Sequence, residues 1–101
     1  MCAQLTADQT PTTAFAIVTR AEPHTLVRVL TLFARLDLMP ARLIGMTSVR
    51  EAKLSLTIEV ADLAREEREN LVARLASLLG VLEVRAMDKP LQTAFPYSDE
   101  A

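Results

Sequence analysis

The chain has 101 residues, of which 50% are apolar and 24% charged, and its formal net charge is −2. This length suits one ordinary domain, and the composition is typical of globular proteins rather than disordered or fibrous ones. So small a net charge gives no electrostatic basis for binding nucleic acid, and we expect none to bind.

The cysteine content and the chain ends narrow the class further. The only cysteine, Cys2, excludes an internal disulfide and argues against a metal site built on thiolates. Residues 1–13 contain no basic residue and no apolar run typical of a signal peptide, and no later segment has the length of a membrane span. We therefore expect a cytoplasmic protein that needs no metal, no cofactor and no membrane.

The same composition divides the chain into three parts. Residues 1–12 are rich in Thr, Gln, Asp and Pro, and are predicted to form a flexible arm because they offer little apolar surface to bury. Residues 89–101 contain two prolines and an acidic end, and are predicted to form an irregular tail. The folded domain is then residues 13–88.

The first half of this domain predicts a strand followed by a helix. Residues 13–19, TAFAIVT, form a short apolar, β-branched run typical of a buried strand. Pro23 suits the first turn of a helix, which Asp37 and Pro40 then end because proline cannot continue the hydrogen-bond ladder. The apolar stripe at helical spacing consists of Leu26, Val29, Leu30, Phe33 and Leu36.

Two further strands, a helix and a last strand follow. Residues 41–49 are apolar on both faces, so their periodicity does not show which side meets the core. Residues 53–60 alternate strictly between apolar and polar, which predicts a strand with one buried face. Asp62 is predicted to cap the second helix and Gly80 to close it, before a strand at residues 81–87. The predicted inward residues are Leu54, Leu56, Ile58, Val60, Leu71, Val72, Leu75, Leu78, Leu79, Leu82 and Val84.

This order of elements predicts an α+β fold, the ferredoxin-like βαββαβ sandwich, with a four-stranded antiparallel sheet covered on one face by two helices. The second strand is then an edge that contains neither proline nor lysine, and such an edge tends to associate. We therefore predict a homodimer paired through this strand. Its residues are Arg42, Leu43, Ile44, Gly45 and Met46.

Because this fold serves many functions, the residues have to discriminate between them. An RNA-recognition domain would need aromatic residues on its central strands, and KLSLTIEV has none. His24, the only histidine, has no evident nucleophile or second metal ligand tied to it, so we interpret it as an exposed residue of the first helical turn. We expect no catalytic residues, and an enzyme of the dimeric ferredoxin-like kind is a third and weaker alternative.

Residues 15–88 resemble an ACT domain, and are most similar to the small regulatory subunit of acetolactate synthase (acetohydroxyacid synthase), isozyme II type. The most specific matches are PHTLVRVLTLFARLDL, similar to the helix-one signature of that family, and LASLLGVLEV, similar to its closing strand. The resemblance implies a non-catalytic subunit that binds and activates the catalytic large subunit in branched-chain amino-acid biosynthesis. It also implies pairing through strand two, with valine, leucine or isoleucine held at the seam.

The resemblance places the effector site in the loop AEPH and across the dimer interface. The implied residues are Ala21, Glu22, Pro23, His24, Thr25 and Met39. Three family positions differ here: His24 and Asp37 replace glycines, and Met39 replaces an asparagine, so feedback by an amino acid is expected to be weak or lost. Two interpretations of AEPH stay open, a plain helix N-terminus and a modified effector site. The alternative function is a stand-alone ACT module that senses a small amino acid at its dimer interface.

Overall fold

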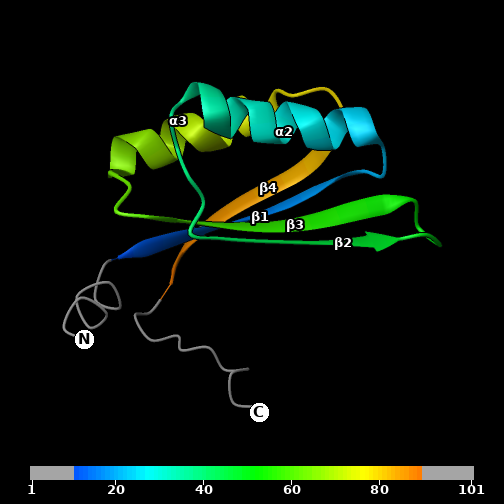
Figure 1. The fold of residues 1–101 in the computed structure, drawn as a ribbon, viewed down its shortest axis with the longest axis horizontal. Coiled ribbons are helices and arrows are strands. Elements are labelled where there is room, and N and C mark those ends of the chain that lie inside the picture. Colours follow the sequence, from blue (N-terminus) through cyan, green and yellow to red (C-terminus); the bar gives the residue numbers. More distant parts are fainter. Residues whose placement is uncertain (1–10, 90–101) are drawn as a thin grey trace, which may run out of the picture.

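The computed structural model describes residues 11–89 and shows the predicted order of elements (Figure 1). The strands are β1 (Thr12–Arg20), β2 (Arg42–Ser48), β3 (Lys53–Ala61) and β4 (Val81–Lys89), and the helices are α2 (Pro23–Arg35) and α3 (Arg65–Ala76). The predicted arm and tail lie outside the described residues except at their inner ends, where Thr12 begins β1 and Lys89 ends β4.

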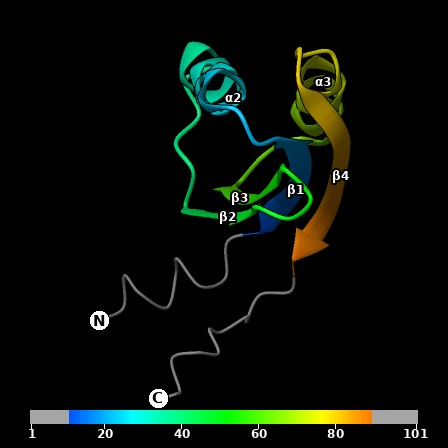
Figure 2. The same cartoon turned by 90° about the vertical axis from the view of Figure 1, so that its right-hand side faces the viewer.

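The four strands form one antiparallel sheet in the order β2-β3-β1-β4. Both helices lie on the same face of this sheet, α2 above the β2 side and α3 above the β4 side (Figure 2). This arrangement confirms the predicted ferredoxin-like sandwich and places β2 at an edge, as the sequence predicts.

The core lies between the sheet and the helices. In the sheet, Phe15 pairs with Ile58 and Ile17 with Leu56, and all four side chains are buried. The rings of Phe15 and Phe33 meet edge to face with centroids 6.2 Å apart, a geometry that stabilises the fold by about 0.5–1.5 kcal/mol beyond the area buried. The helices contribute the buried residues Val29, Leu32, Phe33, Leu71 and Leu75.

The predicted cap of the second helix is wrong. Asp62 follows β3 in a left-handed conformation, with a φ of 56°, and its N–H donates to the carbonyl of Pro11 at 2.8 Å. The helix instead begins after Ala64, whose N–H donates to Glu67 Oε1 at 3.0 Å. The carboxylate at the start of α3 is thus that of Glu67, which accepts the N–H of the N-cap residue and places negative charge in the first turn.

The end of the second helix also differs from the prediction. The N–H groups of Ser77 and Leu78 bond to carbonyls three residues back, which tightens the last turn and ends α3 at Ala76 rather than at Gly80. Gly80 instead enters β4 with a φ of 94°, and Leu79 is 73% exposed. Leu82 is also exposed, because a register shift opposite Val18 and Thr19 removes it from the alternation.

We predict that replacing Ala52 with glycine stabilises the protein. Ala52 ends the turn between β2 and β3 with a φ of 56°, a left-handed conformation that disfavours any residue with a Cβ. Glycine removes this backbone strain, and the gain exceeds the cost of the greater conformational freedom of glycine in the unfolded chain. The free energy of unfolding measured by urea denaturation should therefore rise by about 0.5–1 kcal/mol. The matched control is Ala73→Gly on the exposed side of α3, which should lose about 1 kcal/mol. A urea midpoint for Ala52→Gly below that of the wild-type chain would contradict the proposed backbone strain at Ala52.

Candidate functional site

The loop AEPH forms a tightly bonded entrance to α2. The N–H of Ala21 donates to the carbonyl of Ala52 at 3.1 Å, and the carbonyl of Glu22 accepts the N–H groups of Thr25 and Leu26. Glu22 occupies the N-cap position in an extended conformation, and Pro23 stands in the first turn as predicted. The N–H of His24 makes no hydrogen bond to another described residue, so it points out of the helix start unpaired.

Of the five loop residues assigned to the effector site, one is inaccessible. Thr25 is fully buried, and its hydroxyl lies 3.3 Å from Glu22 Oε1. Gly80 lies against the same threonine side chain, which closes the space between α2 and the start of β4. The residues Ala21, Glu22, Pro23 and His24 are exposed.

Met39, the sixth residue of the implied site, lies at the other end of α2. It is 85% exposed in the segment between α2 and β2. The 13 residues of the helix separate it from His24 by about 20 Å. The fold of one protomer therefore does not bring the two parts of the implied site together.

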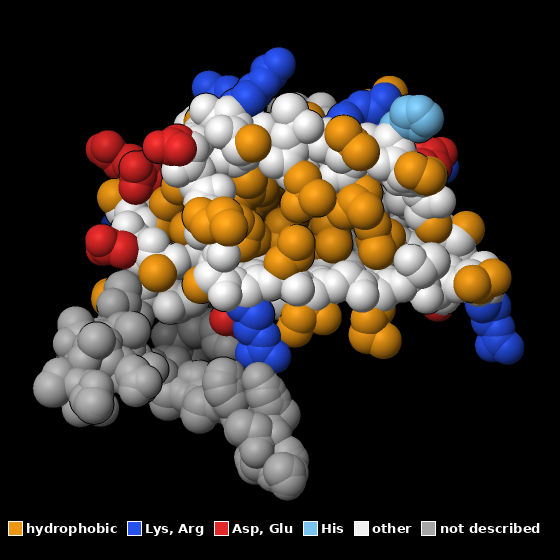
Figure 3. Space-filling view, in the orientation of Figure 1, with side chains coloured by type: hydrophobic (Ala, Val, Ile, Leu, Met, Phe, Trp, Pro, Cys, Tyr) orange, Lys and Arg blue, Asp and Glu red, His pale blue; other side chains and the backbone are white. Residues whose placement is uncertain are grey.

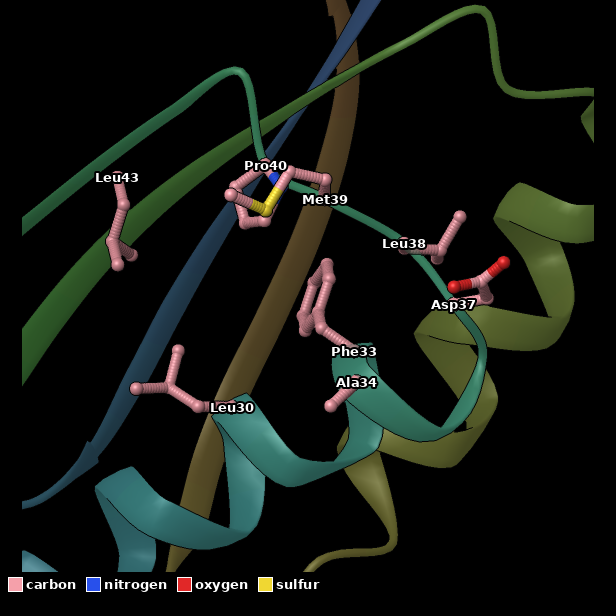
Figure 4. Close-up of a pocket in the computed structure, with 8 residues that line it drawn as sticks. All are labelled: Leu30, Phe33, Ala34, Asp37, Leu38, Met39, Pro40 and Leu43. Atoms are coloured by element: carbon pink, nitrogen blue, oxygen red, sulfur yellow. The ribbon is translucent and has the colours of Figure 1, made fainter.

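A pocket of about 450 Å³ opens beside Met39, between the last turns of α2, the segment after it and β2. Its walls are apolar, with Phe33 and Leu30 on the helix facing Leu43 on the strand, and Asp37 is the one ionisable residue among its lining residues (Figure 4). A volume of this order is typical of small-molecule sites. The sequence did not predict this pocket, because its residues come from three segments that only the fold brings together. The apolar run around Asp37 was the available signal.

The end of α2 shapes this pocket. The N–H of Asp37 donates to the carbonyl of Ala34 at 3.0 Å and that of Leu38 to the carbonyl of Phe33 at 2.9 Å, the two bonds of a Schellman motif. Asp37 has a φ of 59°, the left-handed conformation that glycine adopts most easily. Asp37, at the position where the resemblance implies a glycine, thus has the backbone conformation that glycine favours.

The edge strand β2 is exposed and apolar on both faces. Leu43 and Gly45 pair with the buried Ile58 and Leu56 and so lie on the helical side, whereas Ile44 and Met46 lie on the open side of the sheet. The exposed fractions are 46% for Leu43, 40% for Ile44 and 70% for Met46. Figure 3 shows hydrophobic side chains in the hollow between the helical layer and the rim of the sheet, and further hydrophobic side chains that project below this rim.

Within residues 11–89 no group of three or more His, Cys, Asp or Glu side chains could hold a metal ion. Neither α2 nor α3 is long and apolar enough to cross a membrane.

Comparison with known proteins identifies a matching family and several solved structures with a similar fold. The sequence model described as the ACT-like domain matches residues 6–92. A search of the curated proteins found no significant match.

Solved structures resemble the chain at low sequence identity. The ACT domain of the GTP pyrophosphokinase of Chlorobium tepidum is 10% identical with a TM-score of 0.65, over 75% of this chain and 96% of that one. The C-terminal domain of the MgtC protein of Mycobacterium tuberculosis is 17% identical with a TM-score of 0.64, over 84% and 95% of the two chains. An uncharacterized protein of Thermotoga maritima is 17% identical with a TM-score of 0.62, over 76% and 94%. At these identities the likeness concerns the fold alone.

Proposed function

The chain belongs to the ACT-like domain family, a family of regulatory modules for small ligands, and from this membership we propose that it is a non-catalytic regulatory subunit. Its proposed partner is the catalytic large subunit of acetolactate synthase, an enzyme of branched-chain amino-acid biosynthesis. We propose that the chain binds and activates this subunit in the cytoplasm. The choice of this partner is supported by the helix-one motif at residues 23–38 and by the closing motif at residues 75–84.

The observation that carries a regulatory role is the exposed apolar edge β2. A strand that presents unpaired backbone groups and large apolar side chains gains hydrogen bonds and buries area when a second strand adds to it. Two copies paired antiparallel at β2 would extend the sheet to eight strands and cover Leu43, Ile44 and Met46. We propose this dimer as the working form of the protein.

The same pairing would complete the effector site. A two-fold axis at β2 reverses the direction of the second copy, so the N-terminal end of its α2 approaches the C-terminal end of the first. His24 of one copy would then face Met39 and the apolar pocket of the other, although one protomer holds them about 20 Å apart. The pocket suits an aliphatic side chain, and the carboxylate of Asp37 suits an ammonium group.

The first test is acetolactate formation by the catalytic subunit from the same source, with and without this chain. We expect the rate to rise when the chain is added, because the regulatory subunit stabilises the active form of its partner. Adding valine, leucine and isoleucine separately then tests whether the proposed dimer interface binds an amino acid. Loss of activation with one of them identifies the effector. An unchanged rate at saturating concentrations of the chain would refute the proposed partnership.

A second candidate is a stand-alone module that senses one amino acid, and the pocket of about 450 Å³ beside Asp37 favours it. Its test is a thermal-shift panel of amino acids, since a ligand that binds only the folded state raises Tm by mass action. At a ligand concentration of a hundred times its Kd, the free energy of unfolding should rise by about 2.7 kcal/mol. A shift with one amino acid, together with no effect on acetolactate formation, would favour this function over the first.

A further inference from the structure

The solvent face of α2 carries positive charge only. The helix contains Arg28 and Arg35 but no aspartate or glutamate, although the whole chain has a net charge of −2. The other helix differs, because α3 balances three arginines against three glutamates. Figure 3 shows Lys and Arg side chains standing on the helical layer, with the Asp and Glu side chains mostly gathered towards one end of the view.

Both of these arginines border a second apolar hollow, which we name the arginine groove. It has a volume of about 230 Å³ and lies between α2 and the turn after α3. Its floor and walls come from Val27, Arg28, Thr31, Leu32, Arg35 and Leu78. The groove shares no lining residue with the pocket at β2, so it could still bind a partner when two copies are paired through β2.

Neither arginine has an acidic partner within residues 11–89. The ion pairs there join Arg68 to Asp88 and Arg85 to Glu83, on α3 and β4. Arg28 makes only a long bond of 3.3 Å to the carbonyl of Leu79, and Arg35 makes no side-chain hydrogen bond to a described residue. The guanidinium groups therefore keep their capacity for a carboxylate, which they bind in a bidentate manner.

We propose that the arginine groove docks an acidic amphipathic helix of a partner protein. Arg28 and Arg35 are seven residues apart, two helical turns or about 10.5 Å along the axis. A partner helix with carboxylates two turns apart would pair with both, and an apolar side chain between them would fill the space over Leu32 and Leu78. The groove goes beyond the proposed function, because it can serve any partner with this pattern.

Other anionic partners fit the groove less well. Anionic membranes are recognised by clusters of about four to eight basic residues, whereas this groove has two. Duplex DNA would need several phosphate contacts, and the apolar floor between the two arginines has no group that binds phosphate. A helix with both carboxylates and an apolar side chain uses all parts of the groove.

The probe for the test is a fluorescent helical peptide with two glutamates two turns apart and leucine between them. We expect anisotropy to show binding to the full chain, weakened at least about tenfold in Arg28→Glu/Arg35→Glu, a loss of roughly 1.4 kcal/mol. The control, Arg65→Glu/Arg74→Glu on exposed positions of α3, changes the net charge equally and should leave the affinity within about twofold. A peptide with lysines in place of the glutamates should bind the Arg28→Glu/Arg35→Glu variant, which also shows that this variant folds.

Three results would overturn the proposal. The first is no binding of the acidic peptide to the wild-type chain at millimolar concentration. The second is an equal loss in the two double variants, which would reduce the effect to net charge. The third is binding of duplex DNA or of phosphatidylserine vesicles with the same dependence on Arg28 and Arg35, because the groove would then recognise phosphate rather than a protein helix.

Discussion

Replacing Ile44 with lysine should convert the proposed β2-paired dimer into a monomer of half the mass in light scattering. Ile44 lies near the middle of β2 on the open face of the sheet and is 40% exposed in one protomer. In two strands paired antiparallel about this point, the two copies of residue 44 lie close to the axis. Each copy loses buried apolar area, and the two lysines repel each other. We expect a total loss of about 3 kcal/mol, or roughly a hundredfold in dimer affinity.

The fold of the variant should survive, because the lysine extends from a partly exposed position rather than into the core. The matched control is Met87→Lys on the open face of β4, at the opposite edge of the sheet, where Met87 is 48% exposed. This control introduces the same charge on the same face and should leave the mass unchanged. An unchanged mass for Ile44→Lys would count against pairing through β2, and a monomer in Met87→Lys would move the interface to β4.

Replacing Gly80 with alanine should cost the protein about 2–5 kcal/mol of stability. The residue has a φ of 94°, so an added Cβ strains the backbone by about 1–2 kcal/mol. The Cβ would also overlap Oγ1 of the buried Thr25 and lie 2.9 Å from its Cγ2, and overpacking of this kind costs about 1–3 kcal/mol more. Urea denaturation followed by circular dichroism measures the sum.

A double-mutant cycle with Thr25→Ala separates these two contributions. The alanine removes Oγ1 and Cγ2, so Gly80→Ala in that background should cost the backbone strain and the smaller penalty of a 3.2 Å approach to the Cβ of residue 25. We expect a coupling energy of about 1–2 kcal/mol between the two positions. If Gly80→Ala costs the same with and without Thr25, the contact between the helix start and the β4 entrance is not what excludes a side chain at residue 80.

The cycle also bears on the effector loop. Thr25 packs on Gly80, and the N–H of Arg20 donates to the carbonyl of Gly80 at 2.9 Å, so the start of α2 is fixed by the turn that precedes β4. A ligand at His24 would therefore bind to a preformed loop. Variants at Gly80 should lower the affinity of any such ligand as well as the stability, because they displace the same loop.

Local pattern determined the order of the six elements and most of the core, and the topology rules applied to that order placed β2 at an edge. The strict alternation of residues 53–60 and the stripe from Leu26 to Leu36 reflect periods of 2 and 3.6, which depend only on near neighbours in the chain. Leu32 is buried although it lies outside the predicted stripe, and it lines the arginine groove together with Leu78 from the turn after α3.

Only the tertiary structure decided where the elements meet. The exposure of Leu82 depends on a register shift against β1, the pocket at Asp37 combines a helix end with a strand, and the arginine groove combines α2 with the turn after α3. Asp62 had the residue type of a cap but not the position, because α3 begins only after Ala64. The N–H of Asp62 instead donates to the carbonyl of Pro11, 51 residues earlier in the chain. Such contacts join segments far apart in the sequence, and no local periodicity records which segments the packing brings together.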